Sequence, residues 1–172
     1  MPIDEAIRGR RTHKVFQQDP LDRETISEIL DLARWAPNHK LTNPWRFRVI
    51  GPEAKARLKA AAEADKPGSA VKLDRTPTLI LASVVLDGEE DRRREDLLAV
   101  ASACYIVLLA AHARGLASYW RTVRVLDTEQ GRAALSIPAQ ESPVGLLHLG
   151  YQRQEQRVPE RAPLESVVSF LD

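Results

Sequence analysis

The stretch "LLAVASACYIVLLAAHARGLASYW", residues 97–120, decides the fold. Residues 97–113 are apolar on nearly every side, and Gly115 then stands where helices often end. We therefore expect a long helix in the centre of the fold. The letters "LASYW", residues 116–120, predict a short strand directly after this helix.

The segments around this helix predict a sheet and further helices. "TPTLILASVVL", residues 76–86, is almost continuously apolar and rich in β-branched residues, which predicts a central strand covered on both faces. Residues 45–49 alternate apolar side chains with arginines, as a half-buried strand does, and residues 142–151 predict another strand. Helical patterns cover residues 3–10, the segment from an N-cap at Asp22 to Pro37, residues 51–64 and residues 127–135. This order indicates an α+β sandwich with a mixed sheet and helices on both faces.

The composition is that of one ordinary soluble domain spanning residues 1–172, with 44% hydrophobic and 28% charged residues. The net charge of +1 argues against general nucleic-acid binding, which needs a broad basic surface. A single cysteine, Cys104, excludes an internal disulfide and suggests a reducing compartment. The start of the chain lacks the apolar core of a signal peptide, and no segment approaches the ~20 apolar residues of a membrane span. We therefore expect a cytoplasmic protein that does not enter a membrane.

The familiar catalytic motifs are absent from the sequence. It has no glycine-rich dinucleotide motif after a strand, no P-loop, no serine nucleophile elbow and no zinc-binding HExxH. No histidine stands at a metal-ligand spacing from a cysteine or carboxylate, and we interpret His112 and His148 as structural. Cys104 lies in the middle of the apolar helix and is interpreted as an inert buried thiol. We therefore expect no metal and no catalytic side chain, so that a cofactor supplies any chemistry.

Positive charge gathers near the N-terminus. "RGRRTHKVF", residues 8–16, holds Arg8, Arg10, Arg11 and Lys14. One interpretation is a solvated helix end, because the macrodipole favours arginine at a helix C-terminus, and we keep this interpretation for Arg8. A second is a basic arm that binds nucleic acid, which the near-neutral charge and the lack of a recognition helix disfavour. A third is a phosphate site.

Three segments together resemble the nitroreductase family of flavin mononucleotide (FMN) enzymes, in particular its small, compact members. The first is Arg-Arg-Thr in "RGRRTHKVF"; the second, "ARWAPNHKLTNPWRFRVI", residues 33–50, places Ala-Pro and a polar loop before Pro-Trp. The third is "RGLASYWRT", residues 114–122, after the long helix. The resemblance implies a three-layer sandwich with a mixed, mostly antiparallel sheet, FMN as the cofactor and NAD(P)H as the electron donor.

The resemblance also implies roles for the residues of the basic segment. Arg10 and Thr12 would grip the flavin phosphate and ribityl chain, since a guanidinium binds phosphate bidentately and a hydroxyl adds a further hydrogen bond. Arg11 would contribute further contacts. Lys14 would approach the pyrimidine edge of the flavin, where a cation stabilises the anionic reduced form.

The polar loop of the second segment would cross a dimer interface to the partner's flavin. Asn38 and His39 would contact that cofactor, and Arg34, one turn earlier, would point the same way. A plain helix-to-strand turn is the alternative, because proline and asparagine favour turns regardless. The loop also departs from the family, since it reads Asn-His-Lys-Leu where many members have Ser-Ser-x-Asn, and the chain offers no equivalent of their ring-contacting asparagine.

The third segment would lie beside the flavin ring, although packing at an interface is an alternative for Trp120. Trp45, in contrast, is expected in the core. The cofactor-binding residues that the resemblance implies are Arg10, Arg11, Thr12, Lys14, Arg34, Asn38, His39, Trp120, Arg121 and Thr122.

The expected function is an oxidoreductase that takes hydride from NAD(P)H and passes it, by a ping-pong mechanism, to a nitroaromatic, quinone or similar electron-poor acceptor. Two alternatives stay open: a flavin-binding sensor or storage protein without turnover, and a specialised reductive or oxidative biosynthetic member of the same family. The tail, residues 152–172, is polar, contains prolines and becomes apolar near its end. We expect it to wrap the partner subunit of a homodimer.

Overall fold

The computed structural model describes residues 1–171, which contain one four-stranded sheet in the spatial order β1-β2-β4-β3. All neighbouring strands pair antiparallel. Within the described residues, the one parallel pairing is an isolated bridge between Thr12 and Ser118. The sheet was expected to be mixed, and this bridge is its one parallel part among these residues. The strands are β1 (Trp45–Val49), β2 (Thr78–Val85), β3 (Leu116–Arg121) and β4 (Glu141–Tyr151).

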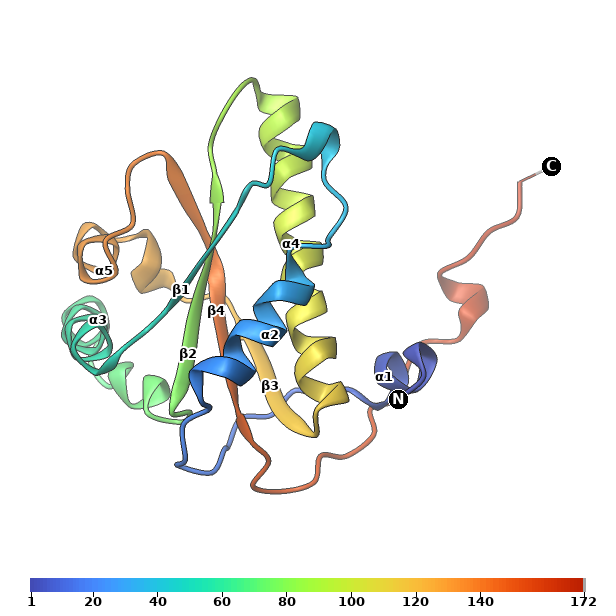
Figure 1. Cartoon of the computed structure of the whole chain (residues 1–172), viewed down its shortest axis with the longest axis horizontal. Coiled ribbons are helices and arrows are strands. Elements are labelled where there is room, and N and C mark those ends of the chain that lie inside the picture. Colours follow the sequence, from blue (N-terminus) through green and yellow to red (C-terminus); the bar gives the residue numbers. More distant parts are fainter. Residues whose placement is uncertain (172) are drawn as a thin grey trace.

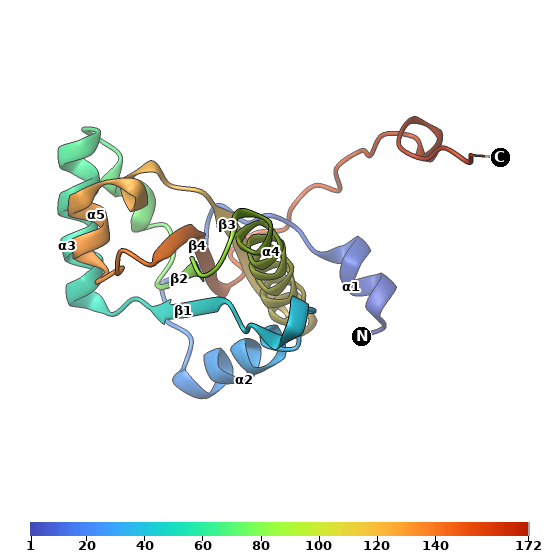
Figure 2. The same ribbon diagram turned by 90° about the horizontal axis from the view of Figure 1, so that it is seen from above.

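Helices cover both faces of the sheet, which confirms the expected three-layer α+β sandwich (Figures 1 and 2). On one face lie α2 (Arg23–Ala33) and α4 (Glu90–Ala113), and on the other lie α3 (Pro52–Asp65) and α5 (Glu129–Ala134). The remaining helix, α1 (Ile3–Gly9), contacts the C-terminal end of α4. Alternate residues of β2 and β4 enter the two cores, which is why these central strands are apolar almost throughout.

The central helix packs as its composition predicts. Ala103, Cys104 and Val107 of α4 are fully buried, and their small volume lets the helix lie close to the sheet. α4 is long and apolar enough to cross a membrane by length and composition, contrary to the expectation that no segment approaches this limit. Its burial against α2 and the sheet is instead the packing of a core helix.

The ends of the predicted helices agree with local chemistry. The Asp22 side chain accepts a hydrogen bond from the Thr25 N–H at 2.7 Å, which confirms the predicted N-cap of α2, and the two hydrogen bonds from Thr25 lower the pKa of this carboxyl. α2 ends at Ala33, ahead of Pro37. Trp45 is buried among α2 and α4 residues, as expected.

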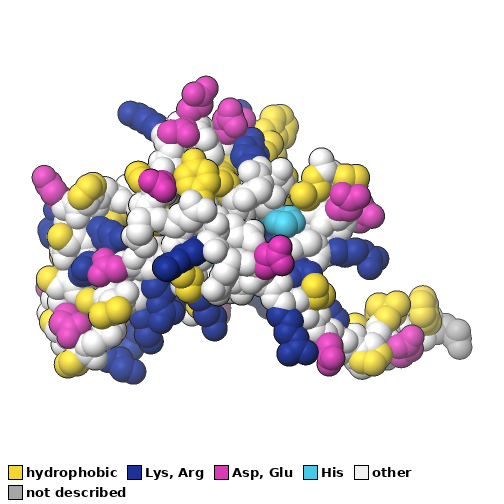
Figure 3. All heavy atoms as spheres, turned by 90° about the horizontal axis from the view of Figure 1, so that it is seen from below, with side chains coloured by type: hydrophobic (Ala, Val, Ile, Leu, Met, Phe, Trp, Pro, Cys, Tyr) yellow, Lys and Arg dark blue, Asp and Glu magenta, His cyan; other side chains and the backbone are white. Residues whose placement is uncertain are grey.

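Both ends of the chain leave the sandwich. α1 and the segment after β4 extend away from the body, as Figures 1 and 2 show, and their apolar side chains remain in contact with solvent. In α1, only Ala6 is buried, whereas Ile3 and Ile7 are 67% and 49% exposed. In the tail, Phe170 is 94% exposed. Within the described residues of one copy, most apolar side chains of α1 and the tail therefore stay exposed, and Figure 3 shows such side chains on the tail where it extends from the body.

A polar network joins the strands β1, β2 and β4 at one end of the sheet. The Arg48 guanidinium of β1 donates to both carboxylate oxygens of Glu141 in β4, at 2.6 and 2.9 Å, and the Ser83 hydroxyl of β2 donates to the same carboxylate. The Arg48 hydrogen bond is the main reason why the pKa of Glu141 is lowered. The Glu141 side chain is buried, so water replaces it poorly as a partner of Arg48. Removing the Glu141 charge would therefore leave the Arg48 guanidinium without its ion-pair partner.

We expect Glu141→Gln to lower the free energy of unfolding by about 2 kcal/mol, because the change keeps the shape but removes the charge that Arg48 binds. Urea denaturation followed by circular dichroism measures this difference. Glu155→Gln, a change of the same kind on the exposed tail, is the control and should be neutral. Equal stability of the two variants would contradict the assigned role of the network.

Candidate functional site

The basic segment lies against the edge of the sheet. The His13 N–H donates to the Ser118 carbonyl of β3 at 3.0 Å, and the Gln17 N–H donates to the Tyr151 carbonyl at the end of β4 at 3.1 Å. Phe16 between them is buried. These bonds fix the course of residues 12–17, with His13 and Phe16 buried and Thr12, Lys14 and Gln17 exposed.

Arg10 is held half-buried over α4. Its guanidinium carbon lies 5.6 Å from the centre of the Tyr105 ring, a cation–π contact. The Arg10 Nε is buried and has no hydrogen-bond partner within the described residues. A buried donor without a partner is rare in proteins, because its lost hydration costs free energy. Arg10 therefore presents the kind of unsatisfied group that a bound anion would satisfy.

The neighbours of Arg10 take different positions. The Arg11 Nη1 donates to the Arg8 and Arg10 carbonyls, so that this guanidinium covers carbonyls at the C-terminal end of α1. The Thr12 side chain is exposed, while its backbone makes the bridge to β3. Lys14 is exposed and lines a cavity of about 130 Å³.

That cavity brings two of the predicted segments together. Lys14 of the basic segment and Arg121 of β3 both line it, together with Tyr119 and His148. Arg121 and Trp120 lie on opposite faces of the sheet, as strand alternation requires. The Trp120 ring packs toward α4 and its Nε1 donates to the Val144 carbonyl at 3.3 Å, while Thr122 follows as an exposed residue.

His148 forms the buried wall of this cavity, next to the rings of Phe16 and Tyr119. Neither ring nitrogen of His148 has a hydrogen-bond partner within residues 1–171. Burial, and to a smaller extent the charge of Arg121, lowers the pKa of His148 to about 4. His148 is therefore a neutral imidazole at pH 7.

The loop that carries Asn38 and His39 lies elsewhere. The Asn38 side chain accepts from the Asn43 N–H at 2.9 Å and donates to the Ala36 carbonyl, which is the bonding of a turn. His39 is exposed, with its Nδ1 3.8 Å from Glu95 at the N-terminal end of α4. Arg34, also exposed, pairs with Asp31 at 2.6 Å. In one copy of the chain, none of the three faces the basic segment.

Helix α4 separates the two groups of predicted site residues (Figure 1). The loop of His39 contacts α4 at Glu95, whereas Gly9 and Arg10 contact it at His112 and Tyr105. At 1.5 Å per helical residue, Glu95 and Tyr105 are about 15 Å apart along the helix. The two groups therefore contact α4 at separate places, and their side chains do not meet within the described residues of one copy.

Residues 1–171 contain no group of three or more histidine, cysteine, aspartate or glutamate side chains placed to hold a metal ion. Cys104 is fully buried, and burial raises the pKa of its thiol to about 12. The thiol is therefore protonated at pH 7 and is no nucleophile. The expected burial of Cys104 is confirmed, and its raised pKa agrees with an inert thiol.

Several members of this region are not among the predicted site residues. Tyr105 holds Arg10 and lies on the central helix, within its apolar run. His148, which the sequence indicates as structural, lies in the cavity wall because it pairs with Tyr119 across β3 and β4. Lys72, between α3 and β2, lines the same cavity and carries no local sequence signal.

The comparisons with known proteins match a family and relatives over most of the chain. A family model described as the nitroreductase family matches residues 7–151. A proposed NAD(P)H nitroreductase of Bacillus subtilis is 28% identical, with 94% of this chain and 90% of the relative covered. The 5,6-dimethylbenzimidazole synthase of Rhodospirillum rubrum is 31% identical, with coverage of 92% and 85%.

Solved structures show the same fold. A nitroreductase-like family protein from Bacillus cereus superposes with a TM-score of 0.90 at 23% identity, over 99% of this chain and 96% of the other. A proposed nitroreductase from Desulfovibrio desulfuricans in complex with FMN superposes with a TM-score of 0.79 at 25% identity, over 98% and 95%.

The neutral state of His148 predicts a pH dependence of stability. Its pKa is about 4 in the folded chain and about 6.5 when unfolded, so the unfolded chain binds the extra proton between these values. Stability should therefore fall as pH decreases through this window, by up to about 3 kcal/mol. His148→Phe keeps the ring contacts but removes the titration, so its unfolding free energy, measured by urea titration at each pH, should fall less. Parallel losses in both proteins would contradict the assignment.

Proposed function

The chain belongs to the nitroreductase family, and from this premise we propose that it is an FMN-dependent oxidoreductase. It takes hydride from NAD(P)H and passes it, by a ping-pong mechanism, to a nitroaromatic, quinone or similar electron-poor acceptor. Bound FMN would supply the hydride transfer in both half-reactions. The chain's own residues bind and orient the cofactor, and no side chain has to act as acid or base.

One observation carries this proposal. The buried Arg10 Nε lacks a partner within the described residues, although the side chain is held in place by Tyr105. A dianionic phosphate satisfies such a donor through a charge-assisted hydrogen bond, and the exposed Thr12 hydroxyl can add another. Arg11 supports the site by holding the carbonyls of Arg8 and Arg10, and so fixes the chain on either side of Arg10.

The cavity beside Lys14 supports the second half of the cofactor site. Lys14 and Arg121 bring positive charge to one cavity, where it stabilises the negative charge of a reduced flavin. Neutral His148 closes the wall without adding a charge. Thr122 offers a hydroxyl at the end of the strand, and Trp120 shapes the site through its packing toward α4.

We propose that the active form is a cytoplasmic homodimer in which Asn38, His39 and Arg34 of one copy meet the Arg10 segment of the other. The separation of these groups along α4 supports this arrangement, because a two-fold axis across two α4 helices brings the N-terminal end of one beside the C-terminal end of the other. The exposed apolar residues of α1 and the tail supply surface for such an interface.

A specialised biosynthetic reaction is the second candidate. The observation that favours it is the 31% identity to 5,6-dimethylbenzimidazole synthase over 92% of the chain. Steady-state NAD(P)H oxidation with an added nitroaromatic or quinone separates the two. Rapid, acceptor-dependent oxidation supports the reductase, and cofactor reduction without acceptor turnover supports the specialised enzyme.

The cofactor site is tested by the visible spectrum of the purified protein, which should show bound oxidised flavin that NADH or NADPH bleaches. Arg10→Gln should weaken FMN binding at least about tenfold, because it removes one charge-assisted contact to phosphate. Arg8→Gln, an equal loss of charge on the exposed face of α1, is the matched control and should bind FMN normally. A wild-type protein that stays colourless with added FMN would disprove the proposal.

The shared site is tested by removing the tail. A chain that ends at Gln152 keeps every residue of both cores, so it should fold, with unchanged circular dichroism. We expect sedimentation velocity to show a dimer for the full chain and a weakened dimer for the shortened one, with a parallel loss of FMN. A full-length monomer that binds FMN tightly would disprove the two-copy site.

A further inference from the structure

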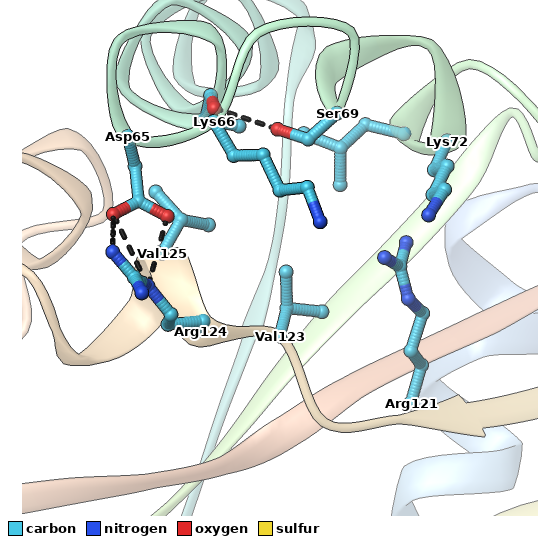
Figure 4. Close-up of a pocket in the computed structure, with 10 residues that line it drawn as sticks. Asp65, Lys66, Ser69, Lys72, Arg121, Val123, Arg124 and Val125 are labelled. Atoms are coloured by element: carbon cyan, nitrogen blue, oxygen red, sulfur yellow. Dashed lines mark hydrogen bonds and ion pairs between the residues drawn. The ribbon is translucent and has the colours of Figure 1, made fainter.

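A second cavity, of about 300 Å³, opens beside the one that contains Lys14. It lies between the C-terminal end of α3, the turn before β2 and the chain after β3 (Figure 4). Lys72 and Arg121 line both cavities, so the two spaces adjoin. Its walls combine buried apolar side chains with cations: Ala62, Leu73, Val123 and Val125 on the apolar side, Lys66, Lys72 and Arg121 on the charged side.

The charges in this cavity are not balanced. Arg124 at its rim is neutralised by Asp65, with the closest oxygen 2.7 Å from Nη2. Lys66, Lys72 and Arg121, in contrast, make no side-chain hydrogen bond or ion pair to any residue of the described chain. Figure 4 shows their charged ends pointing into the same space from three different segments.

Convergent cations raise the local electrostatic potential, and an anion that enters lowers the energy of all three at once. The apolar wall adds a second requirement. Leu73 and Val125 are nearly fully buried, so only the edges of these side chains reach the cavity. This apolar edge can contact the ring or carbon chain of a ligand whose anionic group binds the cations. The pattern fits an organic anion better than a free inorganic ion.

We propose that this cavity binds an anionic group, a carboxylate or a phosphate, of one of the two redox substrates. The inference rests on the proposed function, because the adjoining cavity is there assigned to the flavin. An anion held by Lys66 and Lys72 would leave the rest of the molecule beside the cavity that Lys14 and Arg121 share. The group belongs either to an acidic aromatic acceptor or to the additional phosphate of NADPH.

Binding is measured without turnover, by isothermal titration calorimetry on the purified protein. The first pair of probes is 4-nitrobenzoate and nitrobenzene, and the second pair is NADP⁺ and NAD⁺. We expect one anionic probe to bind more tightly than its counterpart and to lose affinity at high salt, since salt screens exposed charges. The pair that shows the difference identifies the source of the anion.

The variant is Lys66→Gln, which removes one exposed cation outside the proposed flavin site. It should weaken the probe that carries the additional anionic group by about tenfold and leave the counterpart that lacks this group unchanged. Arg23→Gln, an equal loss of charge on the opposite face of the sheet, is the matched control and should change neither. Lys72→Gln provides a second variant should Lys66→Gln fail to fold.

The proposal is overturned if neither anionic probe binds more tightly than its counterpart, or if both lysine variants bind all four probes as the wild type does. Its failure differs from failure of the proposed function. A protein that binds 4-nitrobenzoate but takes up no FMN supports the anion site and rejects the flavoenzyme. A yellow protein that NADPH bleaches, but that binds both members of each pair equally, supports the flavoenzyme and rejects the anion site.

Discussion

The packing of α4 along one face of the sheet is the constraint on which the site depends. Its buried stripe of small residues, Ala103, Cys104 and Val107, holds the helix straight and close to the strands. A helix of 24 residues is about 36 Å long, and its two ends fix the distance between everything that contacts them. The Thr42 hydroxyl donates to Asp96 near one end, and Gly9 approaches His112 at the other.

The exposed termini bear on the proposed two-copy site. The residues that resemble one cofactor site contact α4 at Glu95 and at Tyr105, about 15 Å apart along the helix, and their side chains do not meet in one copy. A second copy would bring the two groups together if the helices ran antiparallel across a two-fold axis. The apolar side chains of α1 and the tail, costly in water for a single copy, then serve the same arrangement.

The sequence predicts the layers and strands well because each depends on local periodicity. The β2 run, the capping Asp22 and the glycine after α4 all carry signals within a few residues.

The features that the sequence does not predict depend on contacts between residues that are far apart in the chain. In β4, the register shifts opposite Ala82 and Ser83, where Gly145 adopts a φ of 148° and a Cβ would meet the Trp120 Nε1 at 2.7 Å. This irregularity shifts the part of β4 before Gly145 relative to β2, and no periodic pattern reveals it. The approach of Lys66 and Lys72 to Arg121 is equally invisible, because about 50 residues separate them in the chain.

Charged side chains that stabilise the fold differ from those around the candidate site, because the former are paired and the latter are not. Where a charge serves the fold, it is paired: Arg48 with Glu141, Arg124 with Asp65 and Lys59 with Asp74. Where His148 is buried beside the cavities, it is neutral, so burial adds no charge to them. Five cations with no side-chain partner among the described residues line the two adjoining cavities: Lys14, Lys66, Lys72, Arg75 and Arg121. Such a distribution costs repulsion in the free protein, and it lowers the energy of an anionic reduced cofactor and an anionic substrate together. A near-neutral chain can thus keep a strongly positive site, because its acidic residues balance the total charge from other parts of the surface.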